Sequence, residues 1–238
     1  MNTPREAPVA METPAAEGAA VGSCVSAPAQ AFRSAVRLFL FVALATALLS
    51  ATYLWTRPRI EASLAAEKMK FIDEVLPSER YDNALLADTL TLSPTPELGQ
   101  KTASVVYRAR LRGEPAALVL EAIAPDGYAG NIRLVMGVTT AGEITGVRVV
   151  EHQETPGLGD YIDPKKDRNK ASPWIAQFTG IVAPGVPDAE WKVKKEKGRF
   201  DQRAGATVSP RAVIEAVRKA ARFAEKAGPR LFVKEETP

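Results

Sequence analysis

An uncharged run of nineteen residues, Leu38 to Thr56, constrains this chain more than any other feature of its sequence. As an α-helix rising 1.5 Å per residue, the run would span roughly 28 Å, about the thickness of the hydrocarbon core of a bilayer. Arg37 and Arg57 close the run at its two ends. A stretch of this length without a charge predicts a transmembrane anchor over residues 33–57.

Two other readings of the run are possible, a cleaved signal peptide and a buried helix of a soluble domain. The hydrophobic part of a signal peptide has about 7–15 residues and is followed by a small-x-small cleavage site, which is missing after Ala51. No charged residue interrupts the run, which disfavours the buried helix. Arg33 and Arg37 precede the run, so the positive-inside rule predicts a cytoplasmic N-terminus.

Composition excludes several classes of function. The net charge of +3 arises from interspersed charges of both signs, and no basic stripe with aromatic residues indicates a nucleic-acid partner. Cys24 is the single cysteine and His152 the single histidine. The chain alone therefore cannot form a disulfide, an iron–sulfur site or a multi-histidine metal site, and we predict no metal site.

The sequence divides into five segments by composition and periodicity. The first is rich in Ala, Pro, Glu and Ser and reads as disordered, and Arg57-Pro58 opens a second helical pattern after the anchor. We expect a disordered tail at 1–32, an anchor at 33–57, a stalk helix with a connecting segment at 58–102, a folded domain at 103–227 and a C-terminal tail at 228–238.

From about residue 103, short apolar runs separated by turn residues are typical of strands. Ala141-Gly142 lies between two such runs and predicts a hairpin. We expect helices to start at Ser172-Pro173 and at Ser209-Pro210, the second being amphipathic to about Ala227. Strands beside helices predict an α+β domain with a mixed or antiparallel sheet and flanking helices. The expected strands cover residues 104–111, 116–123, 132–139 and 144–150.

Three glycine-containing segments, 127–130, 152–160 and 201–210, have the residue types of a binding site. In the third, Gly205 and Ala206 are small enough to give a ligand access to the backbone. Thr207 lies just ahead of a helix start, where free N–H groups and the helix dipole favour an anion. Taken alone, this tripeptide reads as an ordinary helix start, because it is common by chance.

The second segment reads as a rigid exposed loop, because Pro156 fixes its own φ and the glycines at positions 157 and 159 allow tight turns. Leu158, raised on such a loop, is suited to contact with a flat ring, although a plain turn is the alternative. His152 and Glu154 could suggest acid–base chemistry. We instead expect them to fix the loop, and we predict no catalytic residue.

The segments taken together carry a resemblance to a known family. His-x-Glu-Thr-Pro-Gly-Leu-Gly, then Trp174, Phe178 and Trp191, then Gly-Ala-Thr ahead of a helix resembles the periplasmic FMN-binding domain family. Within it, the chain resembles the G subunit of the Rnf ion-translocating electron-transport complex. It also resembles the C subunit of the sodium-pumping NADH:quinone reductase. The likeness covers about residues 103–227.

The resemblance implies that FMN is attached covalently, through its phosphate, to Thr207, the last residue of the family's [Ser/Thr]-Gly-Ala-Thr motif. It also implies that a separate magnesium-dependent flavin transferase makes this bond from FAD. Ala204 occupies the position where Ser or Thr is usual, and Asp201, Gly205 and Ala206 are retained. We therefore expect attachment to survive the change at Ala204.

Further contacts are implied by the same resemblance. Thr155 and Leu158 are expected to pack near the isoalloxazine ring, and Tyr128 is expected to lie along it. A lysine of the basic stretch 192–195, Lys194, is expected to approach the flavin or its phosphate, and lysines there would raise the potential of the flavin. From the charge pattern alone, this basic stretch reads as a solvated edge.

The implied function is that of an electron-transfer subunit in a membrane complex that couples ferredoxin or NADH redox chemistry to ion transport. The implied partners are the other membrane subunits of an Rnf-type complex and the flavin transferase. The implied location is the inner membrane, with most of the chain in the periplasm. The alternatives are a membrane-anchored scaffold or assembly protein without a cofactor, the C subunit named above, and a flavin-carrying sensor or donor to an unrelated reductase.

Overall fold

The computed structural model describes residues 27–233 of the 238-residue chain. Cys24 and residues 1–26 of the expected tail lie outside the described part, as do residues 234–238. The chain forms two units, one ending at Arg59 and the other beginning at Ile60. Each unit is described by itself.

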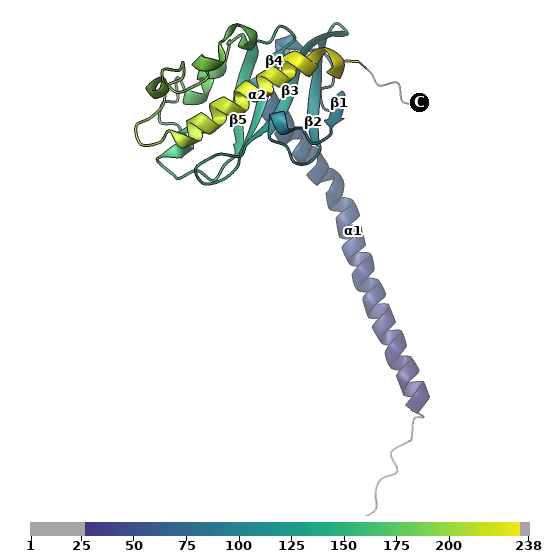
Figure 1. The fold of residues 1–238 in the computed structure, drawn as a ribbon. Coiled ribbons are helices and arrows are strands. Elements are labelled where there is room, and N and C mark those ends of the chain that lie inside the picture. The colour runs from purple at the N-terminus through teal and green to yellow at the C-terminus, as the bar shows by residue number, and fades with distance from the viewer. Residues whose placement is uncertain (1–26, 234–238) are drawn as a thin grey trace, which may run out of the picture. The chain divides into compact units, whose positions relative to one another are not determined.

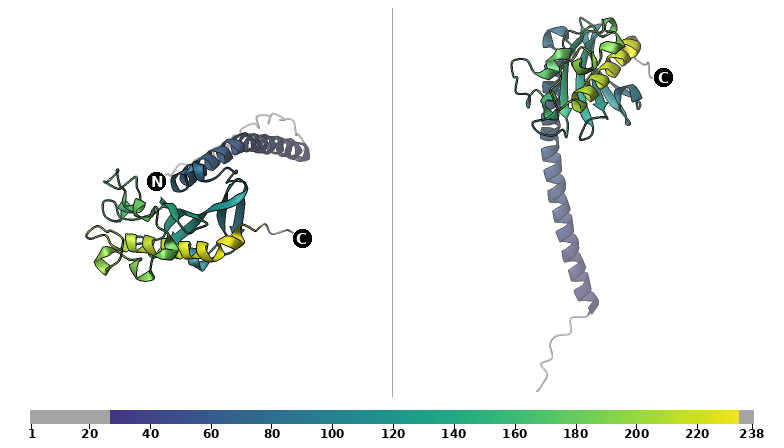
Figure 2. Two further views of the ribbon diagram at one scale, coloured as in Figure 1. Left: turned by 90° about the horizontal axis from the view of Figure 1, so that it is seen from above. Right: turned by 60° about the vertical axis from the view of Figure 1, so that its left-hand side comes forward.

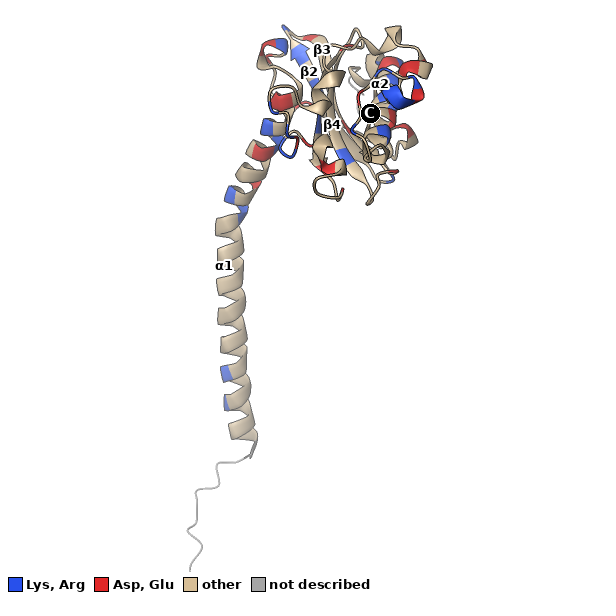
Figure 3. Cartoon of the chain, turned by 90° about the vertical axis from the view of Figure 1, so that its left-hand side faces the viewer, with Lys and Arg blue, Asp and Glu red and all other residues tan. Residues whose placement is uncertain are grey.

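Helix α1 (Ala27–Val75) contains the whole of the described part of the first unit. Its uncharged stretch, bounded by arginines, is plain in Figure 3. The helix is long and apolar enough to cross a membrane, and none of its most apolar window is buried in the structure. The structure therefore agrees with the predicted anchor and disfavours the buried-helix alternative.

Two expected boundaries of α1 differ in the structure. The helix begins at Ala27, so residues 27–32 are helical and not part of the tail, because Pro28 is tolerated in the first turn of a helix. Pro58 lies inside the helix and does not open a second one. A proline removes one backbone hydrogen bond, and here the helix continues through it to Val75.

The second unit is built on one antiparallel sheet of five strands in the order β1-β2-β3-β4-β5. The four expected strand ranges agree closely with β2 to β5, and the hairpin at Ala141-Gly142 joins β4 to β5. One short edge strand, β1, precedes the expected domain start at residue 103. The strands are β1 (Thr89–Leu92), β2 (Ser104–Leu111), β3 (Glu114–Ala124), β4 (Ile132–Thr139) and β5 (Ile144–Glu151).

Each face of this sheet is covered by a helix, as Figure 1 and the left view of Figure 2 show. Helix α2 (Val208–Leu231) packs on the face formed by Leu118, Leu120 and Leu134, and the larger core lies there. The end of α1 covers the opposite face, where Val119 and the residues Ile72, Val75 and Leu76 form a smaller core. The expected apolar face of α2 is buried as predicted: Val213, Ile214, Val217, Ala220, Ala221 and Ala224.

Two glycines let the end of α1 lie directly on the sheet. Gly137 of β4 pairs with Gly146 of β5, and a Cβ atom at Gly137 would lie 2.6 Å from the carbonyl oxygen of Val75. Thr145 Oγ1 donates a hydrogen bond of 2.5 Å to the same oxygen. The missing side chains therefore permit the close approach, and Thr145 satisfies one of the helix's terminal carbonyl groups.

The chain between β5 and α2 forms short 3₁₀ helices around a cluster of buried aromatic rings. The expected helix at Ser172-Pro173 is one such turn, η4 (Trp174–Phe178). Neighbouring rings lie 4.7–5.8 Å apart between centroids, which anchors a region with little regular structure. The cluster consists of Tyr161, Trp174, Phe178, Trp191 and Phe200.

Candidate functional site

A cleft of about 160 Å³ lies where the three glycine-containing segments meet. Six of the seven residues predicted from the sequence line this cleft, although they come from segments far apart in the chain. The lining residues are Tyr128, Glu154, Thr155, Leu158, Gly159, Gly205, Ala206, Thr207, Val208 and Ser209.

The third segment forms a tight turn ahead of α2. The Ala206 N–H donates to the carbonyl oxygen of Arg203 at 3.2 Å, and Gly205 has a φ of 80°. A positive φ at the third position of a four-residue turn favours glycine, which accounts for Gly205. Ala204, at the second position, is exposed.

The Tyr161 hydroxyl forms hydrogen bonds with the first and last residues of this turn. It accepts a hydrogen bond from the Arg203 N–H at 3.1 Å and donates one to the carbonyl oxygen of Ala206 at 3.0 Å. Burial raises the pKa of Tyr161, although the Arg203 N–H and guanidinium oppose this shift. The hydroxyl therefore keeps the proton that it donates to Ala206.

Thr207 occupies the N-cap position of α2, two residues before the expected start. Its side chain caps no backbone N–H of the helix, so the hydroxyl is not committed to the first turn. Ser209, where the helix was expected to start, is buried and donates its hydroxyl hydrogen bond to Glu154 Oε2. The start of α2 thus presents an available hydroxyl beside the N–H groups of a helix N-terminus.

The second segment is an exposed turn, as expected. The Leu158 N–H donates to the Thr155 carbonyl oxygen at 3.1 Å, and the Gly157 N–H donates to Asp160 Oδ1 at 2.9 Å. Leu158 is 53% exposed, and Tyr128 on the neighbouring segment is 72% exposed. Both side chains therefore present apolar surface at the rim of the cleft, where a flat ligand could pack against them.

Glu154 joins the three segments, a role that the sequence did not reveal. Its side chain is 4% exposed, and Oε1 accepts the Ala129 N–H at 3.3 Å while Oε2 accepts the Ser209 hydroxyl. A Cβ atom at Gly127 or Gly159 would lie 2.7 Å or 2.9 Å from a Glu154 oxygen. The two glycines therefore leave the room that this buried carboxylate occupies.

The expected role of His152 agrees with its position outside the cleft lining. The Glu154 N–H donates to His152 Nδ1 at 3.2 Å, and His152 Nε2 lies 4.0 Å from Asp163 Oδ2. The ring therefore holds the loop, as the sequence analysis expected. Among the residues that the structure describes, no group of three or more His, Cys, Asp and Glu side chains is arranged to hold a metal ion.

Asp167 stabilises the turn through Arg203. It is buried, and it pairs with the Arg203 guanidinium while accepting N–H groups from Trp174 at 2.7 Å and Asn169 at 2.9 Å. Burial alone would raise the pKa of Asp167, but these donors and the Arg203 charge outweigh it and hold the pKa below its usual value. Arg203 also lies over the Tyr161 ring, 4.5 Å from its centroid.

Lys194 is the predicted site residue that the structure does not bring into the cleft lining. Its Nζ atom lies 2.6 Å from Asp201 Oδ1, and both side chains are exposed. The ion pair gives Lys194 a partner within its own stretch of chain. The exposure of Lys194 agrees with the reading of this stretch as a solvated edge, and its contact with a ligand stays a prediction.

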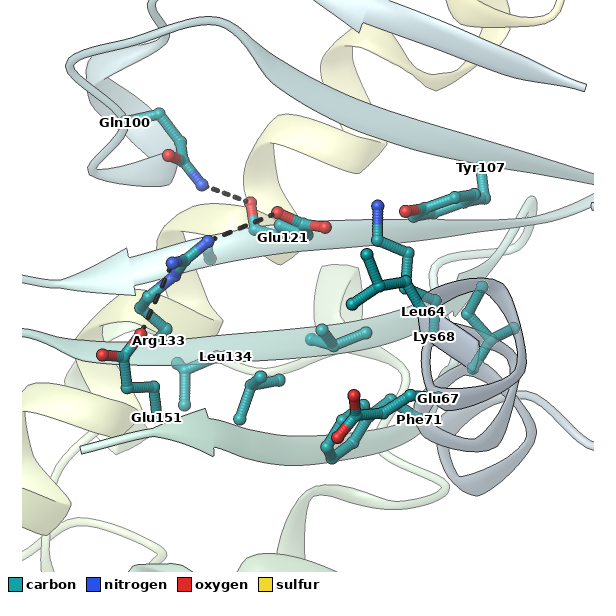
Figure 4. Close-up of a pocket in the computed structure, with 14 residues that line it drawn as sticks. Leu64, Glu67, Lys68, Phe71, Gln100, Tyr107, Glu121, Arg133, Leu134 and Glu151 are labelled. Carbon is teal, nitrogen blue, oxygen red and sulfur yellow. Dashed lines mark hydrogen bonds and ion pairs between the residues drawn. The ribbon is translucent and has the colours of Figure 1, made fainter. Parts of the chain in front are cut away.

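A second, larger groove of about 580 Å³ lies between α1 and the opposite face of the sheet. Figure 4 shows Arg133 between Glu121 and Glu151, at N–O distances of 4.0 Å and 3.4 Å. These charges compensate one another across three strands. No residue of the three glycine-containing segments lines this groove, so the smaller cleft is the candidate site.

The domain that contains the cleft is of a known class, and an apolar helix precedes it in the sequence. The family model described as FMN-binding domain matches residues 127–222, which include all three segments. A second family model, described as RnfG N-terminal region, matches residues 28–75.

Comparison with curated proteins identifies the family. The G subunit of the ion-translocating oxidoreductase complex of Aliivibrio fischeri (strain ATCC 700601 / ES114) is 41% identical over 80% of this chain and 89% of its own length. The protein of the same name from Escherichia coli (strain K12) is 45% identical with the same coverage. The crystal structure of Shewanella oneidensis NqrC is 20% identical, with a TM-score of 0.38 over 66% of this chain and 71% of that chain. The chain belongs to the family of G subunits of the ion-translocating oxidoreductase complex.

Proposed function

We propose that this chain carries FMN bound covalently through its phosphate to Thr207, and that it transfers electrons within an ion-translocating oxidoreductase complex. The observation that carries the proposal is the position of Thr207. Its uncommitted hydroxyl lies at the N-terminus of α2, and the residue lines the cleft. FMN supplies the redox chemistry when bound, while the protein supplies position and electrostatics.

The residues of the cleft fit this cofactor. The N–H groups at the start of α2 would hold a phosphate, and the turn at Gly205 and Ala206 would let it approach the backbone. Leu158 and Tyr128 would pack against the isoalloxazine ring, and Thr155 would lie at its edge. The cleft of about 160 Å³ is smaller than typical ligand pockets of about 300–1,000 Å³ and would enclose only part of FMN. A covalent bond to Thr207 would keep the cofactor attached.

The proposal extends to partners and location. A flavin transferase would attach FMN during maturation, and the remaining subunits of the complex would supply and accept electrons. The chain itself would bind no substrate. Arg33 and Arg37 ahead of the apolar stretch favour a cytoplasmic N-terminus, which puts the flavin domain on the periplasmic side of the inner membrane.

Substitution of Thr207 tests the attachment. Produced together with the flavin transferase, Thr207→Ala should lose flavin fluorescence on a denaturing gel, because the variant has no hydroxyl to form the ester. Thr207→Ser is the matched control, since it keeps a hydroxyl at the same position and should remain fluorescent. Fluorescence retained in Thr207→Ala would refute the assignment. A wild-type chain that stays unmodified would favour the scaffold alternative.

A further inference from the structure

The cleft beside Thr207 contains one charged side chain, and it is acidic. Of the ten residues that line the cleft in the described part of the chain, only Glu154 carries a charge. The resemblance implied that a lysine, Lys194, approaches the flavin or its phosphate. The cleft lining itself contributes a negative charge and no positive one.

The Glu154 carboxylate has hydrogen-bond donors but no cation. Its oxygens accept the Ala129 N–H and the Ser209 hydroxyl, and within residues 27–233 it forms no ion pair. The two donors stabilise the carboxylate without cancelling its charge. Both come from the segments that form the walls of the cleft, so the charge is fixed in place.

Three basic residues near the start of α2 form ion pairs with acids other than Glu154. Arg203 pairs with Asp167, and Arg211 pairs with Glu196. Lys194 pairs with Asp201 at 2.6 Å. None of these three cations is available to neutralise Glu154 in this arrangement.

An unneutralised carboxylate that is 4% exposed costs stability, so its position in the wall of a binding cleft calls for an explanation. We propose that Glu154 is a positioning residue whose fixed negative charge lowers the midpoint potential of the flavin on Thr207. Reduction adds electrons to the ring, and a nearby negative charge of low exposure disfavours that added charge. The inference rests on the proposed attachment of FMN to Thr207.

The test compares midpoint potentials of the full-length, flavinylated chain by redox titration of its visible absorbance. Glu154→Gln removes the charge and keeps a polar atom at both positions: its amide oxygen can still accept the Ala129 N–H, and its NH2 group can donate to the Ser209 hydroxyl, which then accepts. At a fixed ambient potential it should raise the ratio of reduced to oxidised flavin about tenfold, equivalent to a midpoint about 30 mV higher for a two-electron couple. Glu154→Asp keeps the charge and should retain most of the low potential.

Glu151→Gln is the matched control, because Glu151 is three residues away and its side chain is 62% exposed beside Arg133 (Figure 4). It should leave the potential unchanged. Equal potentials for wild type and Glu154→Gln would overturn the inference, as would equal shifts in Glu154→Gln and Glu154→Asp, which would indicate geometry and not charge. Absence of covalent flavin from the wild-type chain would instead refute the proposed function, and the inference with it.

Discussion

The Tyr161 hydroxyl stabilises the turn that precedes Thr207, and removing this one oxygen atom tests its contribution. Tyr161→Phe removes a hydroxyl that lies under the turn and makes two hydrogen bonds, with the Arg203 N–H at 3.1 Å and the Ala206 carbonyl at 3.0 Å. The ring remains in the aromatic cluster, so packing is largely kept. The loss therefore isolates the hydrogen bonds that shape the turn.

The expected cost follows from the burial of the two groups left behind. Ala206 is buried, so its carbonyl would lose its partner without access to water, whereas Arg203 is half-buried and its N–H can be partly hydrated. An unsatisfied buried polar group costs about 1–3 kcal/mol. For a domain of this size, each kcal/mol lowers Tm by about 2–4 °C, so we expect a decrease of about 2–12 °C.

The assay is thermal unfolding of the full-length chain in detergent, together with the rate at which the flavin transferase modifies Thr207. Tyr107→Phe is the matched control, because Tyr107 is also buried but its hydroxyl forms no hydrogen bond within residues 27–233. Tyr161→Phe should unfold at a lower temperature than the control and be modified more slowly. Equal Tm values for the two variants would refute the account of the turn.

Two further predictions concern groups that hold the domain together. The pKa of Asp167 is lower in the folded chain than its unfolded value of about 3.9. Ionised Asp167 therefore stabilises the fold above this pH, and the stabilisation is lost as the pH falls below it. Asp167→Asn should thus lose less Tm than wild type on acidification from about pH 5 to pH 3, and parallel plots of Tm against pH for the two proteins would contradict this. Gly137→Ala places a Cβ atom 2.6 Å from the Val75 carbonyl and should cost about 1–3 kcal/mol of unfolding free energy, whereas Gly185→Ala meets nothing within 4 Å and should be close to neutral in chemical denaturation. Equal stability of these two glycine variants would contradict the close approach of α1 to the sheet.

The glycine-containing segments could be located from the sequence because their residue types are unusual in combination. Thr207, Gly205 and Ala206 line one cleft with Thr155, Leu158 and Tyr128, and their contacts with FMN stay predictions. Their local turns also follow from local sequence: proline and glycine restrict or free φ at known positions.

The supports of the site could not be predicted, because they depend on distant parts of the chain. Tyr161 lies 45 residues before Ala206, and Glu154 lies 55 residues before Ser209. The sequence indicated that Glu154 fixes its own loop, but its burial and its bonds to the other two segments follow only from the fold. Lys194 is the opposite case, since its nearest acid, Asp201, satisfies it locally and leaves it exposed.

The fold was predictable where the apolar period was clear, as in β2 to β5 and α2. The strand β1 (Thr89–Leu92) is too short to be distinguished from a loop by its sequence, and it is defined by its pairing with β2. The continuity of α1 through Pro58 could not be predicted. The sequence shows that a proline removes one helical hydrogen bond, but it does not show that the end of the helix packs on the sheet.

Intact mass spectrometry of the chain, produced with and without the flavin transferase, measures whether FMN is attached to Thr207. Only the chain produced with the transferase should gain the mass of one FMN less one water, and peptide mapping should assign the gain to Thr207. An unmodified chain, under conditions in which the same transferase modifies a related FMN-binding domain, would contradict the proposed attachment, as would a modification mapped to another residue.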